Sequence, residues 1–199
     1  MSDVGSVDSR CSGHEPLGAD SIARAAEYII DTEGVEALTM RRLGRELGVE
    51  AMSVYHHIPN KGALETVLVT RLLAPGDLSG FIADQEGAGA TPDLLVERYA
   101  RRLRSSLHEH PRRLPLVTGL LPAELFDAPV PRAVVDALTN AGFDPSAAAW
   151  ILDAFIGFVI GHSMVEHSNH QATTDDDEAA FETGLRFLLL GLRSELGLT

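Results

Sequence analysis

Residues 39–61 constrain the fold of this chain more than any other stretch, because they encode two short helices separated by a glycine. Thr39 is a suitable N-cap for a first helix that runs to Leu47. Gly48 then ends this helix, at a position where glycine adopts the left-handed conformation at least cost. The second helix ends before Pro59, which cannot continue it. Two short helices joined by a tight turn that contains glycine predict a helix-turn-helix.

The second helix of this unit is predicted from about Ala51 to His57, and its outward side chains suit the major groove of DNA. Val54 and Ile58 are expected to point into the core. The residues expected to meet DNA are Thr39, Arg41, Arg42, Ala51, Met52, Ser53, Tyr55, His56, His57 and Lys61.

Each type of side chain in this set has a defined use at DNA. Arg41 and Arg42 lie at the start of the first helix, in reach of the DNA backbone or a guanine edge. Tyr55 and the two histidines after it can donate hydrogen bonds to phosphates. Lys61 lies in the first turn of a third helix that Asn60 can cap, where unpaired N–H groups favour an anion. The alternative is a helical core unit with an ordinary polar surface.

Residues 21–74 resemble the DNA-binding domain of the TetR family of bacterial one-component repressors. The matching residues are Thr39-Met40-Arg41-Arg42-Leu43, Leu47-Gly48-Val49, Val54-Tyr55-His56-His57-Ile58, Asn60-Lys61 and Leu64. The resemblance implies that Arg41 and residues 51–53 read bases, and that Tyr55, His57 and Lys61 contact phosphates. Ala51 and Met52 depart from the polar or proline residues frequent in the family, which leaves the operator sequence open.

Length, cysteine content and charge set the outer limits. A chain of 199 residues can form one small and one medium domain. The single cysteine, Cys11, excludes a disulfide framework and a cysteine-based zinc site. The first residues are polar and show no signal peptide, so we expect a cytoplasmic protein. Of the net charge of −13, residues 18–74 contribute −2 and residues 75–199 contribute −9, so the less acidic end should face DNA.

Helical periodicity continues to the C-terminus without strand-like alternation, so the chain is predicted to be all-α. We divide it into a disordered arm (1–17), a helix-turn-helix domain (18–74) and a larger helical domain for ligand binding and dimerisation (75–199). The predicted segments are helices near 20–33, 92–109, 114–121, 131–141, 150–165 and 181–196, and a loop over 76–91.

Residues 150–165 and 181–196 carry more apolar surface than one buried stripe accounts for. The sixteen residues 150–165, interrupted by Asp153, His162 and Ser163, are too few to span a bilayer, so we expect no membrane association. Pairing both helices with their symmetry mates would bury the surplus in a four-helix interface, which predicts a homodimer. The candidate interface residues are Ile151, Phe155, Phe158, Val159, Gly161, Leu185, Leu188, Leu189 and Leu192. Gly157 and Gly161 would mark a close approach of two helices, either across the dimer or within one subunit.

The resemblance also implies a small-molecule effector, apolar or aromatic, in a pocket of the C-terminal domain. Candidate ligand-binding residues are Tyr99, His108, Phe126, Trp150, Phe155 and His162, each of which fits a plain core equally well. The resemblance thus implies a homodimeric repressor that binds an inverted-repeat operator on double-stranded DNA. A ligand that changes the spacing of the two DNA-binding domains would release it.

The histidines of the C-terminal half offer a different function, the binding of a metal ion. His162, Glu166 and His170 are spaced four apart and could ligate a metal on one helical face. Scattered histidines at a polar helix end are the interpretation that we favour, so no metal and no cofactor are expected. Catalytic motifs such as HExxH or a P-loop are absent from the sequence, so we predict no enzyme. The alternative is a metal- or small-molecule-binding helical protein or enzyme without a DNA-binding role.

Overall fold

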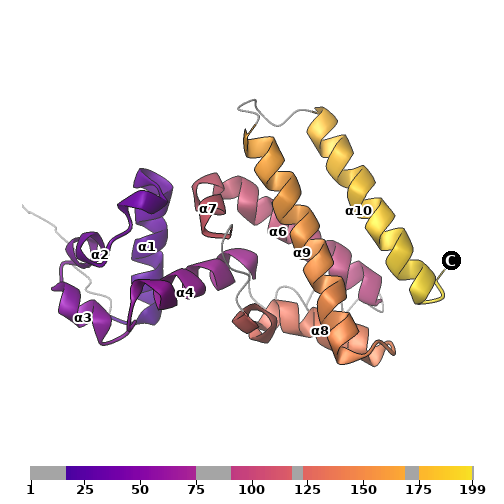
Figure 1. The fold of residues 1–199 in the computed structure, drawn as a ribbon, viewed down its shortest axis with the longest axis horizontal. Coiled ribbons are helices and arrows are strands. Elements are labelled where there is room, and N and C mark those ends of the chain that lie inside the picture. The colour runs from indigo at the N-terminus through magenta and orange to yellow at the C-terminus, as the bar shows by residue number, and fades with distance from the viewer. Residues whose placement is uncertain (1–16, 75–90, 118–122, 169–174, 199) are drawn as a thin grey trace, which may run out of the picture.

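The computed structural model describes residues 17–74, 91–117, 123–168 and 175–198. The regular secondary structure of these ranges is entirely helical, as predicted (Figure 1). The elements are α1 (Ala19–Glu33), η1 (Val35–Ala37), α2 (Met40–Leu47), α3 (Ala51–Tyr55), α4 (Lys61–Leu73), α6 (Pro92–Glu109), η2 (Pro111–Arg113), α7 (Leu114–Val117), η3 (Ala123–Asp127), α8 (Pro129–Asn140), α9 (Pro145–Ser168) and α10 (Asp175–Glu195). The predicted arm and the predicted loop over 76–91 lie, except for their last residues, outside the described residues.

Helices α1–α4 form one unit, which we call the head, and it lies at the left of Figure 1. The predicted helix caps and the predicted glycine turn are present. The Thr39 hydroxyl accepts a hydrogen bond from the Arg42 N–H at 3.1 Å, and Gly48 ends α2 with φ at 68°. Asn60 caps α4 by accepting from the Ala63 N–H at 2.8 Å. The head encloses a core of buried side chains, which includes Ile22, Ala26, Ile29, Leu43, Val54, Leu64 and Leu68.

Some boundaries differ from the predictions for local reasons. Helix α3 ends at Tyr55 rather than His57, because the N–H groups of His57 and Ile58 both bond the Val54 carbonyl and tighten the chain into a turn. Helix α8 begins at Pro129, two residues before the predicted Pro131, since proline suits a first helical turn. The apolar helix predicted from residue 114 is described only as far as Val117.

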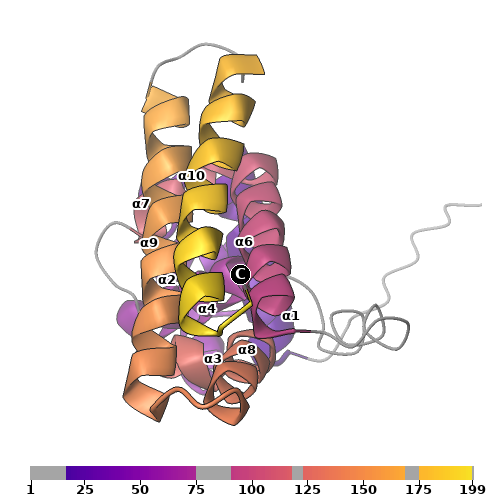
Figure 2. The same cartoon turned by 90° about the vertical axis from the view of Figure 1, so that its right-hand side faces the viewer.

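Helices α6–α10 form the second unit, which we call the body. Helix α9 packs against α6 and α8, and α10 lies beside α9 and α6 on the outside (Figures 1 and 2). Helices α9 and α10 approach closely at Gly184, where an added Cβ would lie 2.6 Å from the Phe158 ring. Neither Gly157 nor Gly161 has an atom within 4 Å of such a Cβ, so they mark no close approach within the subunit.

Helix α9 is by length and composition able to cross a membrane, with a mean hydropathy of 1.6 over its most apolar 18 residues. One such helix is weak evidence, because a core helix passes the same test. Its buried side contributes Leu152, Ile156, Val159 and Ile160 to the core. Only 39% of that apolar window is buried, so the helix leaves apolar surface exposed within the subunit.

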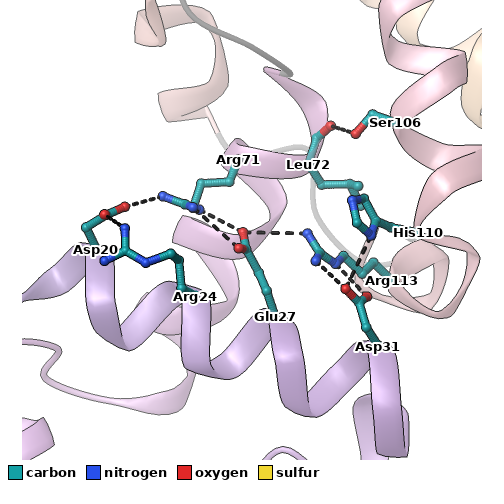
Figure 3. A network of polar contacts seen from close by, with 9 residues as sticks. All are labelled: Asp20, Arg24, Glu27, Asp31, Arg71, Leu72, Ser106, His110 and Arg113. Carbon is teal, nitrogen blue, oxygen red and sulfur yellow. Dashed lines mark hydrogen bonds and ion pairs between the residues drawn. The ribbon is translucent and has the colours of Figure 1, made fainter. Parts of the chain in front are cut away.

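The head and the body meet along α4 and through ion pairs between α1 and η2 (Figure 3). Glu27 of α1 accepts from Arg71 of α4 at 2.7 Å and lies 3.6 Å from Arg113 of η2. Asp31, one turn further along α1, accepts from Arg113 at 2.8 Å and pairs with His110 at 3.2 Å. We call these five residues the head–body ion-pair network. It fixes the head to the body at a second place besides α4.

Candidate nucleic-acid interface

The turn between α2 and α3 is set by two glycines, of which sequence analysis identified one. Gly48 supplies the left-handed residue. A Cβ at Gly44, within α2, would lie 2.9 Å from the Val49 carbonyl oxygen, so only glycine lets the turn fold back onto α2. The Val49 N–H bonds the Gly44 carbonyl at 2.9 Å. A glycine inside an otherwise regular helix was the signal that could have identified Gly44.

The outer face of α3 is open to solvent. Val54 is buried and Ala51 and Ser53 are partly buried, whereas the remaining predicted contacts on and after this helix are exposed. Met52 is 65% exposed and Tyr55 40%. His56 and His57, which were predicted to lie on the helix, lie in the turn that follows it and are also exposed. None of these four exposed positions carries an acidic side chain that would repel phosphate.

The two arginines at the start of α2 differ in their surroundings. Arg42 bonds Glu33 of α1 at 2.5 Å and Glu46 of its own helix at 2.8 Å. The hydrogen bond from Arg42 holds the pKa of the Glu33 carboxyl below its ordinary value. Arg41 is exposed and has no ion pair within the described chain. Contact of both arginines with DNA stays a prediction, and Arg42 would have to give up two carboxylates to make it.

Lys61 begins α4 close to the end of α3. Its ammonium is about half exposed and lies 3.5 Å from Glu65, one turn along the same helix. Asn60 uses the Ala63 N–H, and other N–H groups of this first turn remain available to an anion. Arg41, Tyr55 and Lys61 thus come from three elements around the exposed face of α3. A surface of this kind can place a helix in a groove and hold the phosphates on either side.

Comparison with known proteins agrees with this geometry. Residues 22–65 match the family model described as bacterial regulatory proteins, tetR family. The helix-turn-helix region of the chain is thus similar to that of the TetR family.

The chain is also similar to named transcriptional regulators. The chain is 34% identical to the HTH-type transcriptional repressor DrrR1 of Streptomyces coeruleorubidus, over 55% of this chain and 38% of DrrR1. It is 25% identical to the tetracycline repressor protein class E of Escherichia coli, over 90% of this chain and 92% of that repressor. The structure of BioQ with its double-stranded DNA operator superposes with a TM-score of 0.65 at 25% identity, over 89% and 98% of the two chains.

The predicted effector residues in the body are not gathered around one cavity. Tyr99 is fully buried, its hydroxyl donates to the Leu73 carbonyl, and burial raises its pKa. Phe155 belongs to the core and Phe126 packs against it. Trp150 is 72% exposed at the start of α9, so its expected place in an enclosed pocket is corrected.

A polar cluster around the buried side chains of Arg104 and Glu166 includes the other two candidates, the exposed His108 and the partly buried His162. Glu166 of α9 accepts from Arg104 of α6 at 2.8 Å, and its carboxylate lies 2.7 Å from His108 and 3.1 Å from His162. Burial raises the pKa of Glu166, but the hydrogen bonds and charges of Arg104 and His108 outweigh burial, so the pKa lies below its ordinary value. The Ser163 hydroxyl is buried and has no hydrogen-bond partner among the residues that the structure describes.

This cluster changes the metal hypothesis. Glu166 is already neutralised by Arg104, which leaves it a poor ligand for a cation. Across the described residues, no group of three or more His, Cys, Asp or Glu is placed to hold a metal ion, and His170 lies outside them. The structure therefore gives the alternative of a metal-dependent protein no support.

Two pockets adjoin the body. One of about 390 Å³ lies between α6 and α10 and is lined by Arg101, Arg104, Ser105, His108, Glu178, Phe181 and Glu182. The Arg104 guanidinium stacks on the Phe181 ring at 4.1 Å within it. The second, of about 590 Å³, lies between head and body, and its lining includes Glu27, Arg71 and Arg113 of the ion-pair network. Each pocket mixes charges of both signs and is more polar than the apolar pocket expected.

The predicted dimer residues divide into two groups. Phe155, Val159, Leu185, Leu189 and Leu192 are buried in the core of the subunit, which corrects their assignment to an intersubunit surface. Ile151, Phe158 and Leu188 are partly buried, and Gly161 is exposed. Apart from Gly161, the small and apolar residues that face outward were not in the predicted set: Trp150, Ala154, Gly157 and Val165 share one stripe of α9 with Gly161, and Phe187 and Leu190 lie on α10.

Proposed function

We propose that the chain is a homodimeric transcriptional repressor that inserts α3 into the major groove of an inverted-repeat operator. The observation that carries this proposal is the exposed face of α3, with Arg41 and Lys61 beside it on neighbouring elements and unblocked by the core. Its likeness to the DrrR1 repressor and to BioQ bound to its operator supports the same reading. A DNA-binding role places the protein in the cytoplasm.

The dimer is proposed from surface chemistry. Phe187 is 66% exposed, and the outward stripe of α9 consists of apolar and small residues. Soluble monomers rarely leave such a patch open to water. Figure 2 views this side of the molecule, with α10 in front between α9 and α6. Packing this face on its symmetry mate would hold the two heads in fixed relation for two half-sites.

The effector is proposed to be a small organic molecule bound in the body or between body and head. The likeness to a tetracycline repressor along nearly the whole chain supports release by a small molecule. The described pockets are lined largely by charged and hydrogen-bonding side chains, with the Phe181 ring in one of them. Such a lining favours a ligand that carries hydrogen-bonding or charged groups beside an aromatic surface. Such a ligand acts only through its different affinity for the two states of the head.

The test uses a duplex selected from a random DNA pool by the wild-type protein. Arg41→Ala should weaken binding to that duplex by roughly 1–3 kcal/mol if Arg41 reads a guanine edge. Arg42→Ala is the matched control on the same helix and should cost much less, because its guanidinium is held by Glu33 and Glu46. If the wild type enriches no duplex from the pool and binds no duplex in a fluorescence anisotropy assay, a DNA-binding role is rejected.

A further inference from the structure

Met52 is an exposed apolar side chain on a surface whose neighbours are polar. It is the second residue of α3 and has the greatest exposure, 65%, among the large apolar and aromatic side chains of the described head. Val54 supplies the contact of α3 with the core, so Met52 is not needed to fold the helix. An exposed thioether chain gains stability only when something apolar covers it.

The composition of α3 limits what this helix can read in a major groove. Its residues are Ala51, Met52, Ser53, Val54 and Tyr55. Arginine and lysine read guanine, and asparagine and glutamine read adenine, through paired hydrogen bonds, and α3 contains none of these four types. Serine and tyrosine make single hydrogen bonds that discriminate poorly. Direct readout by α3 must therefore depend largely on apolar contact.

The C5-methyl of thymine is the apolar group that an unmodified base pair presents in the major groove. Because Met52 is long and unbranched, it can cover such a methyl while α3 lies in the groove. Arg41, on the neighbouring helix, is exposed and has no ion pair among the described residues, so its guanidinium can supply a polar contact beside the methyl.

We propose that Met52 is a specificity-determining residue that reads a thymine methyl in each operator half-site. This inference rests on the proposed function, because it requires α3 to enter the groove. It assigns chemistry to a position where the polar or proline residues frequent in the family are replaced. The operator then carries thymine at two symmetry-related positions, one below each Met52.

The experiment removes the methyl without changing base pairing. In the selected operator, each thymine is replaced in turn by deoxyuridine, and affinity is measured by fluorescence anisotropy at one salt concentration. Wild-type protein should lose about fourfold for the thymine below Met52, which corresponds to burial of a single methyl group, and little elsewhere. At the same position, 5-methylcytosine should bind better than cytosine by a similar factor, since it restores the methyl alone.

The variant Met52→Ala links the effect to this side chain. It should bind the thymine operator about tenfold more weakly and become indifferent to deoxyuridine at the sensitive position. Tyr28→Ala is the control, because Tyr28 is a strongly exposed aromatic side chain of the head that lies on α1, outside the helix-turn-helix. That variant should keep the full sensitivity to deoxyuridine. Circular dichroism confirms that each variant retains its helices.

The outcomes separate the two levels of the proposal. Tight binding of a selected duplex that tolerates deoxyuridine at every position overturns the role of Met52 and leaves DNA binding intact. A sensitivity that persists in Met52→Ala also overturns it, because another side chain must then contact the methyl. If the wild type enriches no duplex, the DNA-binding proposal and this inference fail together.

Discussion

Individual side chains on the head differ chiefly in what already holds them. Arg41 and Arg42 are adjacent in the sequence, yet only Arg42 is bound, by a glutamate nine residues earlier on another helix. Sequence analysis could place Thr39, Gly48 and Asn60 correctly, because a cap or a left-handed turn depends on neighbours within a few residues. The pairing of Arg42 with Glu33 depends on how α1 crosses α2, which no local pattern encodes.

Lys61 gives the prediction that belongs to this scale. Lys61→Ala should weaken binding to specific and unrelated duplexes alike, because a lysine at the first turn of α4 contacts phosphate rather than a base. The slope of log affinity against log salt should fall by about one unit for the lysine removed. Arg132→Ala, an exposed residue of α8 in the body, is the control and should leave the slope unchanged. Equal slopes for Lys61→Ala and wild type would remove Lys61 from the interface.

At the scale of elements, the head is attached to the body at two places. Helix α4 passes between them, with the Leu72 and Leu73 carbonyls accepting from Ser106 and Tyr99 of α6. The head–body ion-pair network ties α1 to η2 separately, and Glu27 is shared by Arg71 and Arg113 (Figure 3). Sequence analysis predicted helices on both sides of this contact but not the contact, since its partners are at least 26 residues apart.

Neutralising Glu27 tests this second attachment. Glu27→Gln leaves Arg71 and Arg113 without the carboxylate between them, and we expect the free energy of unfolding to fall by about 1–3 kcal/mol. Glu36→Gln, an exposed carboxylate of η1, is the control and should stay within about 0.5 kcal/mol of wild type. Urea denaturation followed by circular dichroism gives both values. No difference between the two variants would show that the network contributes little to holding head and body together.

The polar cluster around Glu166 predicts a dependence on pH. Since its pKa is lowered in the folded protein, Glu166 contributes stability above its unfolded pKa, near 4.5, and loses it as pH falls through the folded value. Glu166→Gln should therefore be less stable than wild type at pH 6, by about 1–3 kcal/mol, because Arg104 loses one charged partner but keeps Glu178 at 2.5 Å. That difference should shrink between pH 5 and pH 3. A constant difference over this range, measured by urea denaturation, would contradict the assigned pKa shift.

At the scale of the whole molecule, the periodicity of α9 and α10 predicted an apolar surplus but not which residues form it. The five assigned residues that proved buried lie on the stripes by which α9 and α10 pack into their own subunit. Two apolar faces on one helix have the same composition, and only the packing with α6 and α8 decides which is inward. The lining of the two pockets could be predicted even less well, because it combines side chains from helices that are distant in the chain.

The outward face yields the last prediction. Phe187→Glu places a carboxylate on the exposed side of α10, where it disturbs no contact in the core of the subunit. If this face meets its symmetry mate, the substitution buries an unpaired charge in each subunit, which costs several kcal/mol at the interface. Sedimentation equilibrium at micromolar concentration should then show a dimer for wild type and a monomer for the variant, with operator affinity lost in parallel.

Leu94→Glu is the matched control, because Leu94 is similarly exposed but lies on α6. It should remain dimeric and bind the operator as wild type does. This comparison separates loss of a specific interface from the general effect of adding an acid to an already acidic chain. A dimeric Phe187→Glu would move the interface away from the outer face of α10. A monomeric wild type would leave nothing to hold two heads one turn of DNA apart, and the proposed repression through an inverted repeat would fall with it.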